Sequence, residues 1–491
     1  MNNPKTPAFL GIDLGTSSVK LILVAPKNSP SAGDTPSVPI IRKSGASYEE
    51  ISPAGWYAAL CRAARELELS AGEVTAVGLS SQVGTYIING TDVLSWNDPC
   101  GQNECAEIKR RYPKDTFLRE IRMPHPDIAS YPLPRLLHIS ENFSPIREIC
   151  MPKDILCEHL TGQRVSDPYS WRGLSDTVSG RFSPYFLSEI TKWGIPSSAL
   201  PPLCSPVSCI GTITETAAGE TGIPAGTPVY LGMNDFFCSL VGMGMTEVGD
   251  AFDITGTSEH LGVMEDILHP DTAMVSSPYP CGGGSGTSLY VHYGVTASSG
   301  ASQKFSLSEL GVRTPDIEGC LARRAPIFLP YLNGERAPIF DPDARGTFFG
   351  IGTETTREDL AYAVLEGVAF SLYHIYTEMG SPALNTLRVS GGASRDPILN
   401  RLKALLLGTT LCTLSENDTS ALGAAMCAAV GCGFSAGFSS AAEVFNRPLE
   451  TFSYHPDTDG ELRRKLLDRF AVYRGLYPAL KGAFGQWKTI L

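Results

Sequence analysis

The segment 9–24, FLGIDLGTSSVKLILV, combines a carboxylate with a turn of small residues between two apolar runs. Asp13 interrupts the first run, and Gly15, Thr16 and Ser17 follow it closely. The backbone N–H groups of such a turn can bind an anion, for example a phosphate, without basic side chains. The alternative is an ordinary β-hairpin, in which Gly supplies a positive φ and the Asp and Ser side chains bond to the local backbone.

The same arrangement recurs near the midpoint of the chain. Gly256, Thr257 and Ser258 follow a second apolar run that carries Asp253. A strand, a Gly-Thr-Ser turn and a second strand at the start of each half predict two lobes of related build, each presenting an anion-binding loop to a shared cleft. Two unrelated hairpins would produce the same short match.

Asn234 and Asp235 form a third candidate group, placed where an apolar strand ends and an apolar helix is predicted to begin. The carboxyl ends of strands form the rim at which open α/β sheets bind ligands. A carboxylate at this rim can act as a general base that takes a proton from a hydroxyl group. The alternative is that Asp235 only caps the helix.

Two further loops could contact a ligand. Trp96 lies close to Asp98 in the sequence, and an aromatic face with a carboxylate suits a polyhydroxylated molecule. A loop with a half-buried Trp is the alternative. The run Gly391-Gly392-Ala393 ends a predicted strand and would let a flat purine approach the backbone, although a tight strand-to-helix turn needs the same residues.

The segment 328–351, FLPYLNGERAPIFDPDARGTFFGI, is a long polar loop rich in Pro and Gly. Its length and turn chemistry predict an ordered functional or hinge loop. A surface loop braced by ion pairs is the alternative. The charged residues of the loop are Glu335, Arg336, Asp341, Asp343 and Arg345.

Strand-like and helix-like segments alternate along the chain, which predicts an α/β fold that positions these residues. The longest predicted helix covers 355–379, where Thr356 and Asp359 form a capping box and apolar residues follow the i, i+3, i+4 spacing. A strand is predicted at 387–394 and a last amphipathic helix at 460–476.

The chain has 491 residues, 43% hydrophobic and 18% charged, as expected for a globular protein of two or more domains. The predicted division lies near Gly249 and separates residues 1–249 from 250–491. The net charge is −12 without a basic block, so nucleic acid is not an expected partner. No signal-peptide pattern or membrane-length apolar run is evident, which predicts a cytoplasmic protein without a membrane partner.

The cysteines and histidines form no familiar metal or disulfide pattern. The thirteen cysteines include no C-x-x-C, and the eight histidines include no H-x-x-x-H pair. A disulfide framework and a structural zinc site are therefore not expected, and reduced thiols are.

Taken together, these segments resemble the FGGY family of carbohydrate kinases nearly from end to end. The matching motifs, in the family's order, are GIDLGTSSVK, WND, MPKDIL, LTG, GIPAGTPVYLGMNDFFCSLVG, GTS, PYLNGERAPIFDPDARG, LEGVAF, SGGAS and ALGAA. The resemblance implies two actin-like, ribonuclease-H-like lobes with a central cleft. ATP, Mg²⁺ and a small sugar or polyol are the ligands it implies, and it allows a homodimer, because dimers are common among relatives.

The resemblance also implies roles for individual residues. Asp13 would help to hold hydrated Mg²⁺ beside the ATP phosphates, and Asp235 would be the catalytic base. The other residues implied around ATP are Thr16, Ser17, Gly256, Thr257, Gly300, Gly392, Ala393 and Asn400. Those implied around the sugar are Gln82, Trp96, Asp98, Asn234, Asp235 and Phe236. The N-terminal lobe would then supply the sugar site, the first phosphate loop and the base, and the C-terminal lobe would bind the nucleotide.

The chain departs from the family pattern in the implied sugar pocket. Val83 and Gly84 replace the Met-His of xylulokinases, Phe236 replaces a polar residue, and Cys100 replaces an Arg that often follows the W-x-D motif. A pentulose such as xylulose is the first expectation, and gluconate, a tetritol or another polyol stays open. An actin-like or chaperone-like ATPase and a sugar-sensing pseudokinase are the alternatives from other functional classes.

Overall fold

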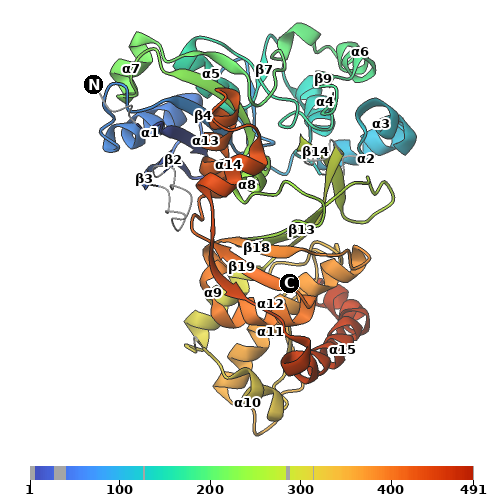
Figure 1. Ribbon diagram of the computed structural model, residues 1–491. Helices are drawn as coiled ribbons and strands as arrows, with labels where there is room; N and C mark the ends of the chain where they lie inside the picture. Colours follow the sequence, from blue (N-terminus) through green and yellow to red (C-terminus); the bar gives the residue numbers. More distant parts are fainter. Residues whose placement is uncertain (1–5, 27–39, 125–127, 283–287, 313, 490–491) are drawn as a thin grey trace. The chain divides into compact units, whose positions relative to one another are not determined.

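The computed structural model describes residues 6–26, 40–124, 128–282, 288–312 and 314–489 (Figure 1). The chain divides into two compact units, and it passes between them more than once, whereas the sequence suggested one division near Gly249. Unit 1 comprises Met1–Thr246, Ser277–Leu289 and Asp418–Arg447, and unit 2 comprises Glu247–Ser276, Tyr290–Asn417 and Pro448–Leu491. Within the described ranges, no helix has the length and apolar character needed to cross a bilayer.

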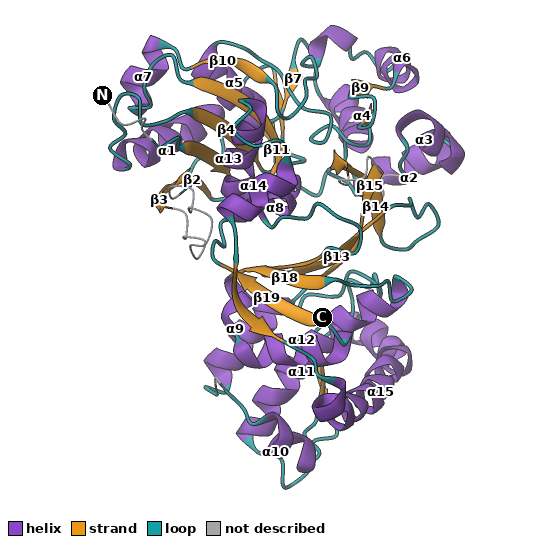
Figure 2. Cartoon of the chain, in the orientation of Figure 1, coloured by secondary structure: helices purple, strands orange, loops and turns teal. Residues whose placement is uncertain are grey.

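The main sheet of unit 1 has six strands in the order β10-β11-β4-β1-β2-β3 (Figure 2). An antiparallel meander of β1, β2 and β3 is followed by β4 and β11, which run parallel to β1, and β10 is antiparallel at the edge. The bounds are β1 Phe9–Leu14, β2 Ser18–Ala25, β3 Ile40–Ser47, β4 Ala76–Ser81, β10 Cys209–Thr212 and β11 Pro228–Asn234.

The second large sheet repeats this plan. Its seven strands have the order β14-β15-β13-β12-β18-β19-β20, and most of β14 falls in the segment grouped with unit 1. Here β12, β13 and β15 form the meander, β18 and β19 run parallel to β12, and β20 is antiparallel. The bounds are β12 Ala251–Thr255, β13 Glu259–Glu265, β14 Val275–Gly282, β15 Ser288–Thr296, β18 Thr386–Gly391, β19 Thr410–Leu414 and β20 Pro448–Phe452. The shared strand order confirms the predicted α/β class and the internal repeat.

Helices cover the sheets within each unit. Those of unit 1 are α1 Pro53–Glu66, α2 Gln102–Arg111, α3 Lys114–Ile121, α4 Pro132–Asn142, α5 Pro152–Thr161, α6 Pro184–Lys192, α7 Glu215–Thr221, α8 Asp235–Gly242, α13 Thr419–Gly431 and α14 Phe438–Phe445. Those of unit 2 are α9 Ser299–Glu309, α10 Ile317–Ala322, α11 Arg357–Glu378, α12 Pro397–Leu407 and α15 Pro456–Lys488. The short strands are β5 Tyr86–Ile88, β6 Asp92–Leu94, β7 Ile149–Cys150, β8 Ser175–Asp176, β9 Arg181–Phe182, β16 Ile327–Leu329 and β17 Thr347–Phe349.

The helix predicted at 355–379 is confirmed as α11, which begins after Thr356 with the predicted capping box. The predicted strand at 387–394 ends earlier, because Gly391 has a φ of +94° and the chain turns into a short 3-10 helix. The predicted helix at 460–476 is longer in the structure, since α15 continues through Pro478 and buries Phe484.

Strand β1 is buried at every residue, as expected for a strand covered on both faces. Side chains alternate between the two faces. Leu10 and Ile12 pack in the same core as Trp56 of α1, so the intervening Gly11 faces the other side. On that side, α13 lies against β1, β4 and β11.

Two adjacent glycines allow α13 to approach the sheet closely. Gly11 of β1 and Gly78 of β4 are direct register partners. A Cβ atom at Gly11 would lie 1.8 Å from the carbonyl oxygen of Ala421, and one at Gly78 would lie 1.8 Å from that of Ala424. Because both obstacles are backbone atoms of one helix, a side chain at either position must displace α13.

We expect Gly78→Ala to lower the free energy of unfolding by about 3 kcal/mol or more, because overpacking against backbone cannot relax by a rotamer change. Gly219→Ala in α7 is the matched control, since no atom lies within 4 Å of its added Cβ and alanine favours helix. Urea unfolding of both variants measures the difference. Equal stability of the two variants would contradict the close packing of α13.

Candidate active site

Asp13 lies in β1 near the Gly15 turn, with only 6% of its surface exposed. Ser80 on the parallel neighbour β4 donates a hydrogen bond of 2.8 Å from Oγ to Asp13 Oδ1. Burial raises the pKa of Asp13 above its usual range, and the Ser80 hydrogen bond partly offsets this. The strand therefore holds a buried carboxyl group beside the turn.

Asp235 is the first residue of α8, at the carboxyl end of β11. The helix cap is Asn234 rather than Asp235, because Asn234 Oδ1 accepts from Phe237 N–H at 3.1 Å. The Asn234 amide in turn donates to the carbonyl of Tyr169 at 3.0 Å. Asp235 accepts at Oδ1 from the N–H of Phe236 at 2.8 Å, so its Oδ2 is available for other chemistry.

The electrostatics of Asp235 suit a base that works near neutral pH. Loss of hydration raises the pKa of Asp235 to about 7, and the negative charge of Asp13 adds to this rise. The Phe236 hydrogen bond and the Arg172 charge oppose it. General bases are most effective when their pKa lies near the working pH.

The first Gly-Thr-Ser turn is exposed at Thr16 and Ser17, which leaves both residues accessible to a ligand. Gly15 N–H donates to the Ser18 carbonyl at 3.0 Å and closes the turn. Trp96, 40% exposed, donates from Nε1 to Thr16 Oγ1 at 3.3 Å. The structure thus places the predicted sugar-contacting Trp beside the predicted phosphate turn.

The loop that carries Trp96 and Asp98 is held by a residue that the sequence analysis missed. Arg135 of α4 is fully buried, and its guanidinium donates to the carbonyls of Ser95 at 2.9 Å and Asp98 at 3.0 Å. It also contacts the sulfur of Cys100. A guanidinium therefore lies beside Cys100, although it comes from a distant part of the chain.

A second arginine missed by the sequence analysis lies near Asp235. Arg172 is buried, and its guanidinium carbon lies over the rings of Tyr131, Phe236 and Phe237 at 5.5, 5.7 and 5.1 Å. Phe236, which looked like a lost polar group, thus supports a cation. No local sequence signal marks this arginine, because the rings come from two segments distant from it in sequence, Tyr131 and the adjacent Phe236 and Phe237.

Gln82 follows β4 and is 3% exposed. The backbone N–H of Gln82 donates to the carbonyl of Leu14 at 2.8 Å, and this bond fixes Gln82 beside the end of β1. In the described part of the chain, its Oε1 is buried and has no hydrogen-bond partner. Buried polar atoms are normally paired, so this oxygen suits a ligand donor.

In unit 2, the second Gly-Thr-Ser turn lies next to the turn after β18. Thr255 and Gly391, the last residues of β12 and β18, are register partners in a parallel pair. Gly300 N–H donates to the carbonyl of Gly256 at 3.1 Å, and a Cβ at Gly300 would lie 2.3 Å from that oxygen. The start of α9 therefore packs directly on the turn.

The remaining predicted nucleotide residues of unit 2 lie at the same sheet edge. Gly392 and Ala393 form the start of the 3-10 helix Gly392–Arg395, and Gly392 is exposed with open space at its Cα. Asn400 of α12 donates from Nδ2 to the carbonyl of Ser394 at 2.8 Å and so supports this turn. Among the described residues, Asn400 Oδ1 is buried without a hydrogen-bond partner.

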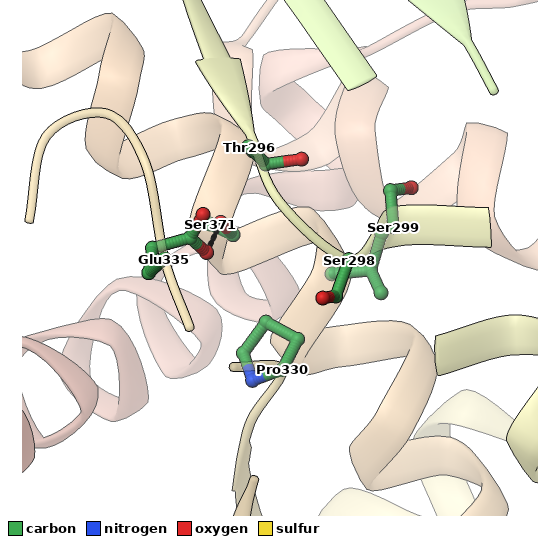
Figure 3. Close-up of a pocket in the computed structure, with 7 residues that line it drawn as sticks. Thr296, Ser298, Ser299, Pro330, Glu335 and Ser371 are labelled. Atoms are coloured by element: carbon green, nitrogen blue, oxygen red, sulfur yellow. Dashed lines mark hydrogen bonds between the residues drawn. The ribbon is translucent and has the colours of Figure 1, made fainter. Parts of the chain in front are cut away.

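Glu335 anchors the 328–351 loop inside unit 2. Its Oε1 accepts from the N–H groups of Ala297 at 2.6 Å and Arg336 at 2.8 Å, and its Oε2 accepts from Ser371 Oγ at 3.2 Å. Figure 3 shows this carboxyl facing Ser371 in a narrow hollow that is also lined by Thr296, Ser298, Ser299 and Pro330. Burial raises the pKa of Glu335 to about 7. The loop is therefore ordered, and its buried acid positions the segment that leads into α9.

The ion pairs expected to brace this loop are directed elsewhere. Asp343 pairs with Lys488 of α15 at 2.9 Å, and Asp341 accepts from Tyr477 Oη at 2.8 Å. Arg345 donates to backbone carbonyls of the loop itself. The loop is thus tied to α15 rather than cross-braced by its own charges.

Comparison with known proteins relates both halves of the chain to one family. The models of the FGGY family of carbohydrate kinases match residues 8–242 for the N-terminal domain and 253–432 for the C-terminal domain. A xylulose kinase from Bacillus subtilis is 26% identical over 502 residues, which cover 96% of this chain and 97% of its own. Solved structures of a ligand-bound xylulose kinase and a gluconate kinase, both from Lactobacillus acidophilus, each have a TM-score of 0.79 at 22% identity. Each covers 98% of this chain and 100% of its own, and at this identity the likeness supports the fold alone.

Proposed function

The chain belongs to the FGGY family of carbohydrate kinases and is a carbohydrate kinase; we propose that it phosphorylates a pentulose such as xylulose with ATP and Mg²⁺. The observation that carries this proposal is Asp235, a carboxylate with a pKa raised to about 7 at the start of α8. The family relationship to xylulose kinases supports the acceptor.

Asp235 acts as the general base in this mechanism. The hydroxyl oxygen of the sugar attacks the γ-phosphorus of ATP as the bond from that phosphorus to the bridging oxygen breaks. The hydroxyl proton passes to Asp235 Oδ2, because Oδ1 accepts from Phe236 N–H. Phosphoryl transfer depends mainly on positioning and charge stabilisation, so the base contributes by orienting and deprotonating the nucleophile.

The residues present suit Mg²⁺ and a phosphorylated ligand. Asp13 offers hard oxygen ligands of the kind that Mg²⁺ prefers, and it would hold the hydrated ion through water. The ion neutralises phosphate charge when bound. Thr16 and Ser17, exposed on the turn beside Asp13, would bind phosphate oxygens.

The turns of unit 2 would bind the nucleotide. Gly256, Thr257 and Gly300 form a close-packed loop whose backbone can approach phosphates. Gly392 and Ala393 would receive the adenosine, since no atom lies within 4 Å of a Cβ built at Gly392. Asn400 Oδ1 is a buried acceptor that a base or ribose donor can satisfy.

Gln82, Trp96, Asp98, Asn234 and Phe236 would surround the sugar in unit 1. The exposed face of Trp96 covers C–H groups, and the carboxylate of Asp98 accepts from hydroxyls. The N–H of Cys100 keeps the pKa of Asp98 low, so this acid stays ionised. Asn234 positions the helix that carries the base.

An aldonic acid such as gluconate is the second candidate acceptor. The buried guanidinium of Arg172 is the observation that favours it, because a carboxylate on the sugar would pair with this charge near Asp235. A pentulose carries no such charge.

A screen of ADP release tests the acceptor. The purified protein with Mg-ATP is offered ketopentoses, aldonic acids, tetritols, glycerol and heptuloses, and turnover without acceptor is the control. We expect xylulose to give the highest kcat/KM. A preference for aldonic acids would identify the second candidate, and ATP turnover that no polyol changes would contradict the kinase. Intact ATP binding without turnover would indicate a sensor.

A further inference from the structure

Three side chains from unit 2 meet on one face of its sheet, apart from the residues assigned to phosphoryl transfer. Register pairs Val263 with His292 and Glu265 with Tyr290, so Glu265 and His292 lie diagonally on the same face of the β13–β15 ladder. His269 lies four residues beyond Glu265, in the segment after β13. The chain thereby brings two imidazoles to one carboxylate.

The ligand-type atoms of these residues are close together. Glu265 Oε2 lies 2.9 Å from His292 Nδ1 and 2.8 Å from His269 Nε2. One nitrogen or oxygen from each residue lies within 4.8 Å of the other two. Two histidines and one carboxylate are a donor set that Zn²⁺ uses in sites that keep an open fourth position.

The surroundings of His292 orient its ring for a metal. His292 Nε2 lies 3.1 Å from Thr272 Oγ1, which also accepts from the N–H of Met274 at 3.0 Å. The ring can therefore bind an ion through Nδ1, the nitrogen that faces Glu265, while Nε2–H donates to this hydroxyl. Metal-bound histidines usually donate their second ring N–H in this way, and the partner fixes the tautomer.

Glu265 and His269 give solvent access to the cluster, and His292 is buried behind this access. The His292 side chain is 2% exposed, whereas those of Glu265 and His269 are 16% and 29% exposed. The backbone N–H of His269 donates to the buried Ser276 Oγ at 3.0 Å, which fixes the base of that side chain. An ion can therefore enter from solvent and keep a water as its fourth ligand.

We propose that Glu265, His269 and His292 form a binding site for a divalent transition-metal ion, of which Zn²⁺ fits the donor set best. The rings of His269 and His292 are stacked with centroids 4.4 Å apart. When the ion binds, the more exposed His269 ring turns, and its contact with Glu265 is replaced by bonds of about 2.0–2.2 Å from the ion to the imidazole nitrogens and the carboxylate oxygen. The ion links β13, β15 and the segment between β13 and β14, and it stabilises unit 2.

Zinc titration of the metal-free full chain against a chromophoric chelator tests the site. We expect one equivalent to bind, His269→Gln and Glu265→Gln to abolish that equivalent, and Thr272→Val to weaken it by about 10–100-fold, as loss of an outer hydrogen-bond partner does. His138→Gln is the matched control, because His138 Nδ1 makes the same 2.8 Å contact with Glu104. It should leave the stoichiometry unchanged.

Cobalt serves as the spectroscopic probe of the ligands. We expect Co²⁺ to give a tetrahedral visible spectrum without the thiolate charge-transfer band that cysteine ligands would produce. Far-ultraviolet circular dichroism of each metal-free variant verifies folding, and His269 is partly exposed, so its substitution should be tolerated. Zinc binding that survives His269→Gln and Glu265→Gln, a thiolate band, or no zinc binding by the folded wild-type protein would each overturn the proposal.

Discussion

Replacing Asp235 with asparagine should lower kcat by about 10²–10⁴-fold while ATP binding is retained, because a positioned general base contributes this much to proton transfer. Asparagine keeps the shape of the side chain and an oxygen that can accept from Phe236 N–H, so the start of α8 should not change. ADP release measures turnover, and calorimetric titration with ATP measures binding.

Asp98→Asn is the matched control for this prediction. Asp98 is assigned to the sugar, so its loss should raise KM for the acceptor more than it lowers kcat. Wild-type turnover in the Asp235→Asn variant would show that another group is the base.

The pH dependence gives a second measure of the same prediction. Only the ionised form of Asp235 can take a proton, and its pKa is raised to about 7. The kcat/KM of the wild type should therefore fall as pH drops below about 7, which gives the pH profile an acidic limb. The residual activity of Asp235→Asn should lack this acidic limb. An unchanged limb in the variant would assign it to a different residue.

The stability of the same variant has a defined sign. Because the folded pKa of Asp235 lies above the unfolded value of 3.8, its contribution to stability is present below the unfolded pKa and is lost as pH rises through about 7. Asparagine carries no charge, so its free energy of unfolding does not depend on this titration. The difference in free energy of unfolding between the variant and the wild type should therefore be more favourable to the variant at about pH 8 than at about pH 5. This distinguishes loss of the base from misfolding.

Asp13→Asn should raise the Mg²⁺ concentration needed for half-maximal activity by about 10–100-fold, the typical effect of losing a group that orients a metal's ligands. The amide still fills the space beside Ser80, but it lacks the charge that holds a hydrated cation. Titration of turnover with Mg²⁺ at saturating ATP is the measurement.

The internal repeat supplies the control for Asp13. Asp253 lies three residues before Gly256, one position further from its turn than Asp13 is from Gly15. Its Oδ2 accepts from the buried Lys403 Nζ at 2.5 Å, and Glu259 pairs with the same lysine. Asp253→Asn should therefore affect unfolding rather than the Mg²⁺ requirement, since removal of one partner from a buried ion pair is destabilising. An unchanged Mg²⁺ titration in Asp13→Asn would exclude Asp13 from the metal site.

Features that depend only on neighbouring residues were predictable from the order of the amino acids. Alternating apolar segments and Gly-Thr-Ser turns predicted the two hairpins, and the capping box of Thr356 and Asp359 predicted the start of α11. Turn chemistry, caps and periodicity act over a few residues, which is why a single sequence reveals them. The same locality explains why Asp13 and Asp235 could be selected before their surroundings were known.

The contacts between residues far apart in the sequence became visible only in the folded chain. The pairing of Asp253 with Lys403 joins residues 150 positions apart and gives the two repeats different chemistry. Arg135 and Arg172 reach the loop of Asp98 and the neighbourhood of Asp235 from separate segments, and α13 returns to cover Gly11. Such contacts arise from packing and from the cost of leaving buried charges unpaired, which no local pattern encodes.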